Sequence, residues 1–212
     1  LLAIKRKAHH NMFFRIAEEN GRHLLRGATF LSSHPSVLFL HGSRRVQLLT
    51  ENIIGARTTL KCSISMADLL PKDIRLVLYS FDWRWHADNS IPEALHEALP
   101  DDIGHDLSAR TTDDDVLEGL LTPATCMYMQ QLLQLFHSKN LYIEYSGTHL
   151  IVKKFYKIKK ERELQLFYKT FVAFVNSWLE ALDAPPLLLE SDDRSHRLLG
   201  GKAPLQIPTH KE

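Results

Sequence analysis

The sequence predicts an α+β fold, in which a mainly antiparallel sheet is covered by an N-terminal helix and a long C-terminal helix. Short apolar runs separated by Gly, Pro and Ser fill the first half of the chain, which is typical of hairpins. Residues 58–66 alternate apolar and polar side chains, as a strand with one wet face does. The apolar residues of 160–182 recur at helical spacing. Because strands and helices are grouped rather than alternating, the order favours α+β over repeated βαβ units.

The composition is that of an ordinary globular protein. The 212 residues have a formal net charge of +1, so no global field directs the molecule to nucleic acid or to a membrane. The two cysteines, Cys62 and Cys126, have no metal-site or disulfide-framework spacing, and we expect buried free thiols. No run of about 18 apolar residues is present, so the sequence as given contains no segment that spans a bilayer.

In the first half, we expect an amphipathic helix over residues 4–20, because its apolar positions lie four apart and Gly21 can end it. Residues 75–81 are almost continuously apolar, so we expect a strand that is covered on both faces. The other expected strands are 24–25, 29–31, 37–40, 46–50 and 58–66.

In the second half, Pro92 suits the first turn of a short helix over 92–99, and a strand is expected over 105–111. Asp113 to Asp115 begin a short helix, and Thr122 caps a second one. Gly147 supplies positive φ in a hairpin of 141–145 and 149–153. The domain organisation we expect is a basic N-terminal helix over 1–20, a single α+β domain over 21–183 and a flexible tail over 184–212.

The chain begins with Leu1, Leu2, Ala3 and Ile4, followed by Lys5, Arg6 and Lys7. Aliphatic residues followed by cations are typical of the cytoplasmic end of a membrane span. We therefore expect a membrane-associated protein with this domain on the cytoplasmic side. The alternative is an amphipathic helix with no membrane role.

The order of motifs resembles a group of uncharacterised membrane-anchored bacterial domains. The resemblance rests on five segments: Asn20-Gly21, Gly42-Ser43-Arg44-Arg45-Val46, residues 105–111, Leu120-Leu121-Thr122-Pro123 and Tyr145-Ser146-Gly147-Thr148. It covers about residues 20–182 and implies a single-span anchor with a cytoplasmic domain of unknown activity. It implies no functional residues, because none are defined for that group.

Two segments are candidate contact sites. Trp83-Arg84-Trp85 has two indoles one residue apart, so one can close the core while the other stays at the surface as a contact anchor. Core closure by both is the alternative. The second segment is the basic cluster of Lys153, Lys154, Lys157, Lys159, Lys160 and Arg162 around Phe155 and Tyr156. These cations can bind an anionic membrane surface. Alternatively, they can bind the phosphates of a nucleic acid whose bases stack on the two aromatic rings. The simplest alternative is a solvated loop that binds no partner.

Catalytic motifs are absent from the sequence. His96, Asp102 and His105 are the only candidates for a metal site, but His96-Glu97 lacks the second histidine of HExxH, and a solvated acidic connection is the simpler interpretation. No cofactor is expected. The leading hypothesis is a non-enzymatic domain that works by contact with a protein partner or an anionic membrane surface. A metal-dependent hydrolase and a nucleic-acid-binding module are the alternatives.

Overall fold

A computed structural model describes residues 11–13, 15–16, 36–41, 43–53, 57–67, 69–94 and 99–187. In these ranges seven strands form one sheet in the order β1-β2-β3-β7-β6-β4-β5, and every neighbouring pair is antiparallel. The strands are β1 (Ser36–His41), β2 (Arg44–Ile53), β3 (Arg57–Ser65), β4 (Arg75–Tyr79), β5 (Ser108–Thr111), β6 (Tyr142–Ser146) and β7 (His149–Phe155). The predicted α+β class with a mainly antiparallel sheet is confirmed.

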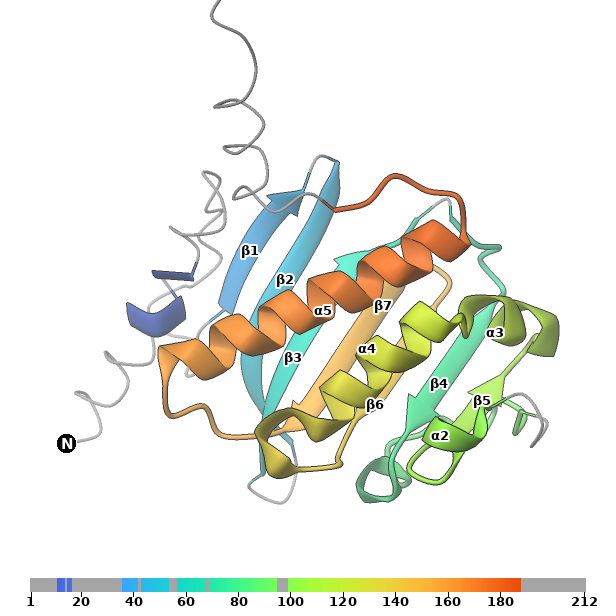
Figure 1. Ribbon diagram of the computed structural model, residues 1–212, viewed down its shortest axis with the longest axis horizontal. Helices are drawn as coiled ribbons and strands as arrows, with labels where there is room; N and C mark the ends of the chain where they lie inside the picture. Colours follow the sequence, from blue (N-terminus) through green and yellow to red (C-terminus); the bar gives the residue numbers. More distant parts are fainter. Residues whose placement is uncertain are drawn as a thin grey trace, which may run out of the picture.

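The helices of the described chain lie mainly over one face of the sheet (Figure 1). They are α2 (Asp101–Gly104), α3 (Asp114–Leu120), α4 (Pro123–Gln134) and α5 (Glu161–Ala181), with single 3-10 turns η1 (Phe81–Trp83) and η3 (Leu135–His137). The predicted closing helix over 160–182 is α5. Of the predicted N-terminal helix, residues 11–13 and 15–16 are described and are helical, and Phe13 and Ile16 are buried in the main core.

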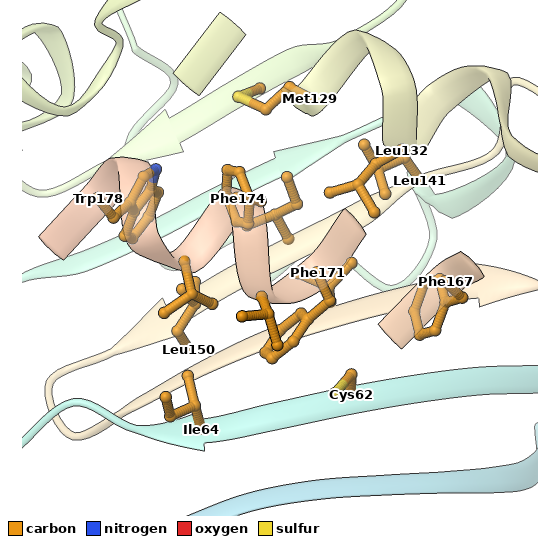
Figure 2. Packing of buried hydrophobic residues seen from close by; sticks show 14 of the residues in the cluster. Cys62, Ile64, Met129, Leu132, Leu141, Leu150, Phe167, Phe171, Phe174 and Trp178 are labelled. Carbon is orange, nitrogen blue, oxygen red and sulfur yellow. The ribbon is translucent and has the colours of Figure 1, made fainter. Parts of the chain in front are cut away.

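The main core lies between this helical layer and the sheet (Figure 2). One stripe of α5 supplies Phe167, Phe171, Phe174 and Trp178, all fully buried. Each such side chain contributes about 1.5–3 kcal/mol of burial free energy, so α5 is the main apolar cover of the sheet. Cys62 and Cys126 are free and buried, as expected, and burial raises the pKa of the Cys62 thiol.

Several local predictions are confirmed. The carboxylate of Asp113 accepts a hydrogen bond from Val116 N at 3.0 Å, and so caps α3. Thr122 Oγ1 accepts from Thr125 N at 3.2 Å, with Pro123 in the first turn of α4. Gly147 has φ of +64° in the turn between β6 and β7.

Three boundaries differ from the sequence predictions. β4 ends at Tyr79 rather than at residue 81, because Ser80 N donates to Leu141 O and the chain then turns into η1. Residues 92–94 are not helical, since Glu93 bridges to Arg110 and Pro92 O accepts from Thr111 N. The strand expected over 105–111 begins at Ser108, after α2.

Other predictions fall at or beyond the limits of the described chain. The strands expected at 24–25 and 29–31 lie outside the described residues, as do 95–98 of the expected 92–99 helix. At the C-terminal side, Leu187 is buried, and its N–H and carbonyl both bond to the side chain of Asn176. The packed chain therefore continues past the 183/184 boundary expected from the sequence.

Candidate interaction surface

The sheet topology brings the two segments singled out in the sequence to one end of the molecule. β4 and β7 are each antiparallel to β6, which lies between them, so they run parallel to each other. Their C-terminal ends therefore point the same way (Figure 1). The loop after β4 contains Trp83 to Trp85, and the segment after β7 contains Lys157 to Lys160. We call these two segments, residues 80–86 and 156–160, the β4/β7 end.

Trp83 closes a small second core on the sheet face opposite α4 and α5. Its side chain is fully buried, and its indole lies on the ring of Phe155 with centroids 3.8 Å apart and planes 3° apart. The Tyr142 ring lies 5.3 Å from the indole. The other buried members of this cluster are Val77, Tyr79, Ala87 and Ile91. Trp83 is thus a packing residue that fixes the 80–94 loop on the sheet.

Trp85 has the opposite environment. It is 81% exposed, and Phe81 in the same turn is 72% exposed. The guanidinium carbon of Arg84 lies 3.9 Å from the Phe81 ring centroid and 4.7 Å from the Trp85 ring. Such cation–π contacts contribute about 0.5–1 kcal/mol each at exposed sites. We call Phe81, Arg84 and Trp85 the aromatic turn.

The interpretation that one indole is buried and the other is exposed agrees with these positions. The geometric cause differs from the one expected, because Trp83 ends a 3-10 turn and Trp85 lies in the turn that follows, rather than both alternating along a strand. Sequence reasoning missed Phe81, which we expected to end a buried strand. The residue that could have indicated the end of the strand is Ser80. Its Oγ accepts a hydrogen bond from Leu141 N, in place of the backbone hydrogen bond that a continuing strand would make there.

The cations after β7 are exposed at the same end. Lys157, Lys159 and Lys160 are exposed, and so is Arg162 in the first turn of α5. The acidic groups beside them are engaged in the fold: Glu163 Oε2 accepts from the backbone N–H groups of Lys159 and Lys160, at 2.9 and 3.1 Å. These hydrogen bonds help to lower the pKa of Glu163.

Lys153 is half-buried on the sheet face opposite α4 and α5, not at the tip of the β4/β7 end. Its Nζ lies 3.9 Å from Glu51 Oε1 and 5.3 Å from the Tyr142 ring centroid. Burial, followed by repulsion from Lys61, lowers the pKa of Lys153. Its charge is therefore partly compensated within the fold.

Lys154 does not belong to the exposed cluster, which corrects the expectation that it provides a surface cation. It is fully buried on the helix side of β7. Its Nζ donates to Leu132 O at 2.7 Å, Leu133 O at 3.1 Å and Ser138 O at 2.9 Å. These carbonyls lie in and just after the C-terminal turn of α4, where the helix dipole also stabilises a cation. Burial lowers the pKa of Lys154 to about 7. Lys154 therefore joins β7 to α4.

Phe155 and Tyr156 are both stacked within the protein. Phe155 lies on Trp83, and Tyr156 lies on Phe136 with centroids 3.9 Å apart and planes 14° apart. A ring that is covered by another ring offers at most one face to a base. This arrangement does not favour the nucleic-acid alternative.

Of the three expected metal candidates, the structure describes only the side chain of His105. His96 and the side chain of Asp102 lie outside the described residues, and His105 is exposed. The nearby Asp106 carboxylate accepts two hydrogen bonds from Lys139 Nζ, each of 2.9 Å. Among the described residues no group of three or more His, Cys, Asp and Glu side chains is placed to hold a metal ion.

The fold and surface define a class of protein: an α+β domain with one antiparallel sheet, helices over one face, and an aromatic turn at the same end of the sheet as exposed cations. One similar solved structure is the crystal structure of the mycobacterial trehalose monomycolate transport factor A, TtfA. It has 9% sequence identity and a TM-score of 0.52, and the match covers 85% of this chain and 97% of that one. At this identity the likeness shows a shared fold.

The other comparisons found no relative. No family model matches the chain, and no curated protein matches it. In the described part of the structure, no helix combines the length and the apolar character needed to cross a bilayer.

Proposed function

We propose that this chain is a non-catalytic contact domain of a membrane-associated protein, and that it rests on an anionic lipid surface on the cytoplasmic side through the β4/β7 end. The observation that supports this proposal most strongly is the 72% and 81% exposure of Phe81 and Trp85 in one turn. Exposed Lys157, Lys159 and Lys160 lie at the same end of the sheet. Large aromatic side chains next to cations are the combination found where proteins meet lipid headgroups.

The buried neighbours of the aromatic turn support a preformed contact surface. Trp83 anchors the turn by stacking on Phe155, and Asp88 closes the following loop through Arg75 Nη2 at 2.5 Å and Ser90 N at 2.8 Å. Phe81 and Trp85 are therefore held outward without the loop having to be ordered on contact. A preformed surface loses less conformational entropy on binding.

The strength of the contact can be bounded from its charges. A cation near an anionic leaflet contributes about 1 kcal/mol, so Lys157, Lys159, Lys160 and Arg162 together contribute about 4 kcal/mol. That free energy corresponds to a dissociation constant of about 1 mM. Asp82, which is exposed in the same loop, reduces this sum. Any affinity tighter than this must come from the aromatic turn. We therefore expect Trp85 to contribute strongly to membrane binding.

Two further considerations point the same way. The resemblance of the sequence to membrane-anchored domains favours a membrane location. TtfA, which has a similar fold, is described as a transport factor. A role by contact rather than by turnover is in keeping with that description.

The proposal is tested by co-sedimentation with vesicles of phosphatidylglycerol and phosphatidylcholine, against vesicles of phosphatidylcholine alone. We expect binding to the anionic vesicles that weakens as salt rises from about 0.1 to about 0.5 M, because the Debye length shortens. The double variant K157E/K160E should lose this binding. The control K72E/K169E makes the same change in net charge at two exposed lysines away from the β4/β7 end and should bind like the wild type.

A second pair of variants separates the aromatic contribution from the charge. Trp85→Ala should weaken binding at every salt concentration, whereas Leu166→Ala, at a 49% exposed apolar residue on α5, should not. Equal binding by K157E/K160E and by its control, or no anionic-vesicle binding at all, would contradict the proposal. Binding to a protein partner without vesicle binding would also contradict it.

A further inference from the structure

The described part of the sheet also has a concavity on the face opposite α4 and α5, away from the aromatic turn. It has a volume of about 500 Å³ and is lined by residues of β1, β2, β3 and the first residue of β7. Two cross-strand rows form its floor. The first is Leu38, Gln47 and Ser63, which are register partners across β1, β2 and β3. The second is Arg45, Ser65 and His149, near the end of the sheet opposite to the β4/β7 end.

The cation of this concavity is uncompensated within the described residues. Arg45 is exposed and takes part in none of the described ion pairs. No Asp or Glu is among the described residues that line the concavity. Arg44, the preceding residue of β2, does not line the concavity, and its Nη1 lies 3.5 Å from Ser65 O. The local charge is therefore positive, in a chain whose overall charge is close to neutral.

The neutral groups are arranged for hydrogen bonding. His149 Nδ1 bonds with Thr148 Oγ1 at 2.8 Å, which fixes the ring and leaves Nε2 for another partner. The hydroxyls of Ser63 and Ser65 and the amide of Gln47 complete a set of donors and acceptors. Leu38 contributes an apolar side chain to the floor of the concavity. A guanidinium suits a phosphate oxygen pair, while hydroxyl and amide groups suit the hydroxyls of a sugar.

We infer that this concavity is a binding site for a phosphorylated sugar or a similar phosphate-bearing polyol. Arg45 bonds to the phosphate, while Gln47, Ser63 and His149 bond to the hydroxyls, and Leu38 contacts the apolar face of the ring. The volume exceeds that of a phosphate ion and lies within the range of roughly 300–1,000 Å³ typical of small-molecule sites. None of these residues belongs to the β4/β7 end, so the site stands independently of the proposed membrane contact.

The test is a titration of the full chain with glucose 6-phosphate, followed by calorimetry and by amide chemical shifts. We expect saturable binding with shifts centred on the strand residues that line the concavity. Glucose alone and inorganic phosphate alone should each bind at least about tenfold more weakly, since each provides only part of the contacts. Inorganic phosphate binding as tightly as glucose 6-phosphate would overturn the inference.

Variants identify the residues responsible. Arg45→Gln should weaken the affinity at least about tenfold, because a charge-assisted bond to the phosphate is lost. Gln47→Leu should weaken it about threefold or more while leaving the cation in place. Lys169→Gln, at an exposed lysine on α5, removes the same charge and is the matched control; it should bind like the wild type. The inference fails if no saturation is seen by about 10 mM, or if Arg45→Gln binds as tightly as its control.

Discussion

The indole of Trp83 and the ring of Phe155 are stacked with their planes 3° apart, and this pair joins the loop after β4 to the end of β7. The two segments are more than 70 positions apart in the sequence, and β6 lies between their strands. The stack therefore holds the exposed aromatic turn against the strand that leads to the exposed cations. It links the two segments of the β4/β7 end within the fold.

The two tryptophans of this loop should respond differently to substitution. Trp83→Ala removes a fully buried indole and should lower the free energy of unfolding by about 3–5 kcal/mol. Trp85→Ala removes an exposed one and should change it by no more than about 0.5 kcal/mol. Urea denaturation measures both. An equal loss of stability would mean that Trp85 is also a packing residue and would remove it from the contact surface.

Lys154 should make stability depend on pH. Its pKa is about 7 in the folded protein because of burial, whereas an unfolded lysine titrates near 10.4. Between these values the unfolded chain binds one more proton, so stability should rise with pH, by at most ~1.4 kcal/mol per unit. Below pH 7 both states are protonated, and this contribution is constant.

The measurement for Lys154 is urea unfolding at pH values of about 6, 8 and 9.5, with the slope expected from proton linkage. The stability of the wild type relative to Lys154→Met should increase across this range. Lys72→Met, at an exposed lysine, serves as the control and should follow the wild type. A difference between wild type and Lys154→Met that stays the same at all three pH values would contradict the proposed pKa.

Gly147 should not tolerate a side chain. Its φ is +64°, and a Cβ at this position would lie 2.3 Å from the backbone oxygen of Lys72. Gly147→Ala should therefore destabilise the protein by at least about 2 kcal/mol. Gly119 provides the matched control, because a Cβ there meets nothing within 4 Å, in helix α3. Gly119→Ala should stabilise the protein by about 0.5–1 kcal/mol, and a similar loss in both variants would argue against the steric explanation.

Asp88 should contribute stability that is lost in acid. Hydrogen bonds from Ser90, and then the Arg75 guanidinium, lower its pKa from 3.8 to about 2. The unfolded chain therefore binds the proton first as the pH falls, so this stability is present above pH 4 and disappears as the pH approaches 2. The stability difference between the wild type and Asp88→Asn should shrink between these two values. A difference that is unchanged at pH 2 would show that the carboxylate does not hold the loop.

Much of the fold could be predicted because local patterns and burial agree. The alternation in residues 58–66, the Thr122-Pro123 start of α4 and the apolar stripe of α5 each specify an element without tertiary information. The helix expected at 92–99 illustrates the limit. Pro92 is compatible with a first helical turn, but pairing of this segment with β5 decides its conformation, and that contact is not local.

The site was harder to predict, because charge and position along the chain give opposing signals at Lys154. Leu150, Val152 and Lys154 share one face of β7, so period-two alternation places this lysine in the core. Its charge suggests the surface instead, and only the carbonyls at the end of α4 explain why it can be buried. The concavity around Arg45 draws on four strands, so no single segment of the sequence reveals it.

The most direct test of the membrane contact is the quenching of tryptophan fluorescence by phosphatidylglycerol vesicles with brominated acyl chains. Trp83 and Trp178 are fully buried and Trp85 is 81% exposed, so quenching by lipid reports mainly on Trp85. We predict strong quenching that is lost both in Trp85→Phe, which lacks the exposed indole, and in K157E/K160E, which should not bind the vesicles. Undiminished fluorescence of the folded wild type on anionic vesicles would contradict the account.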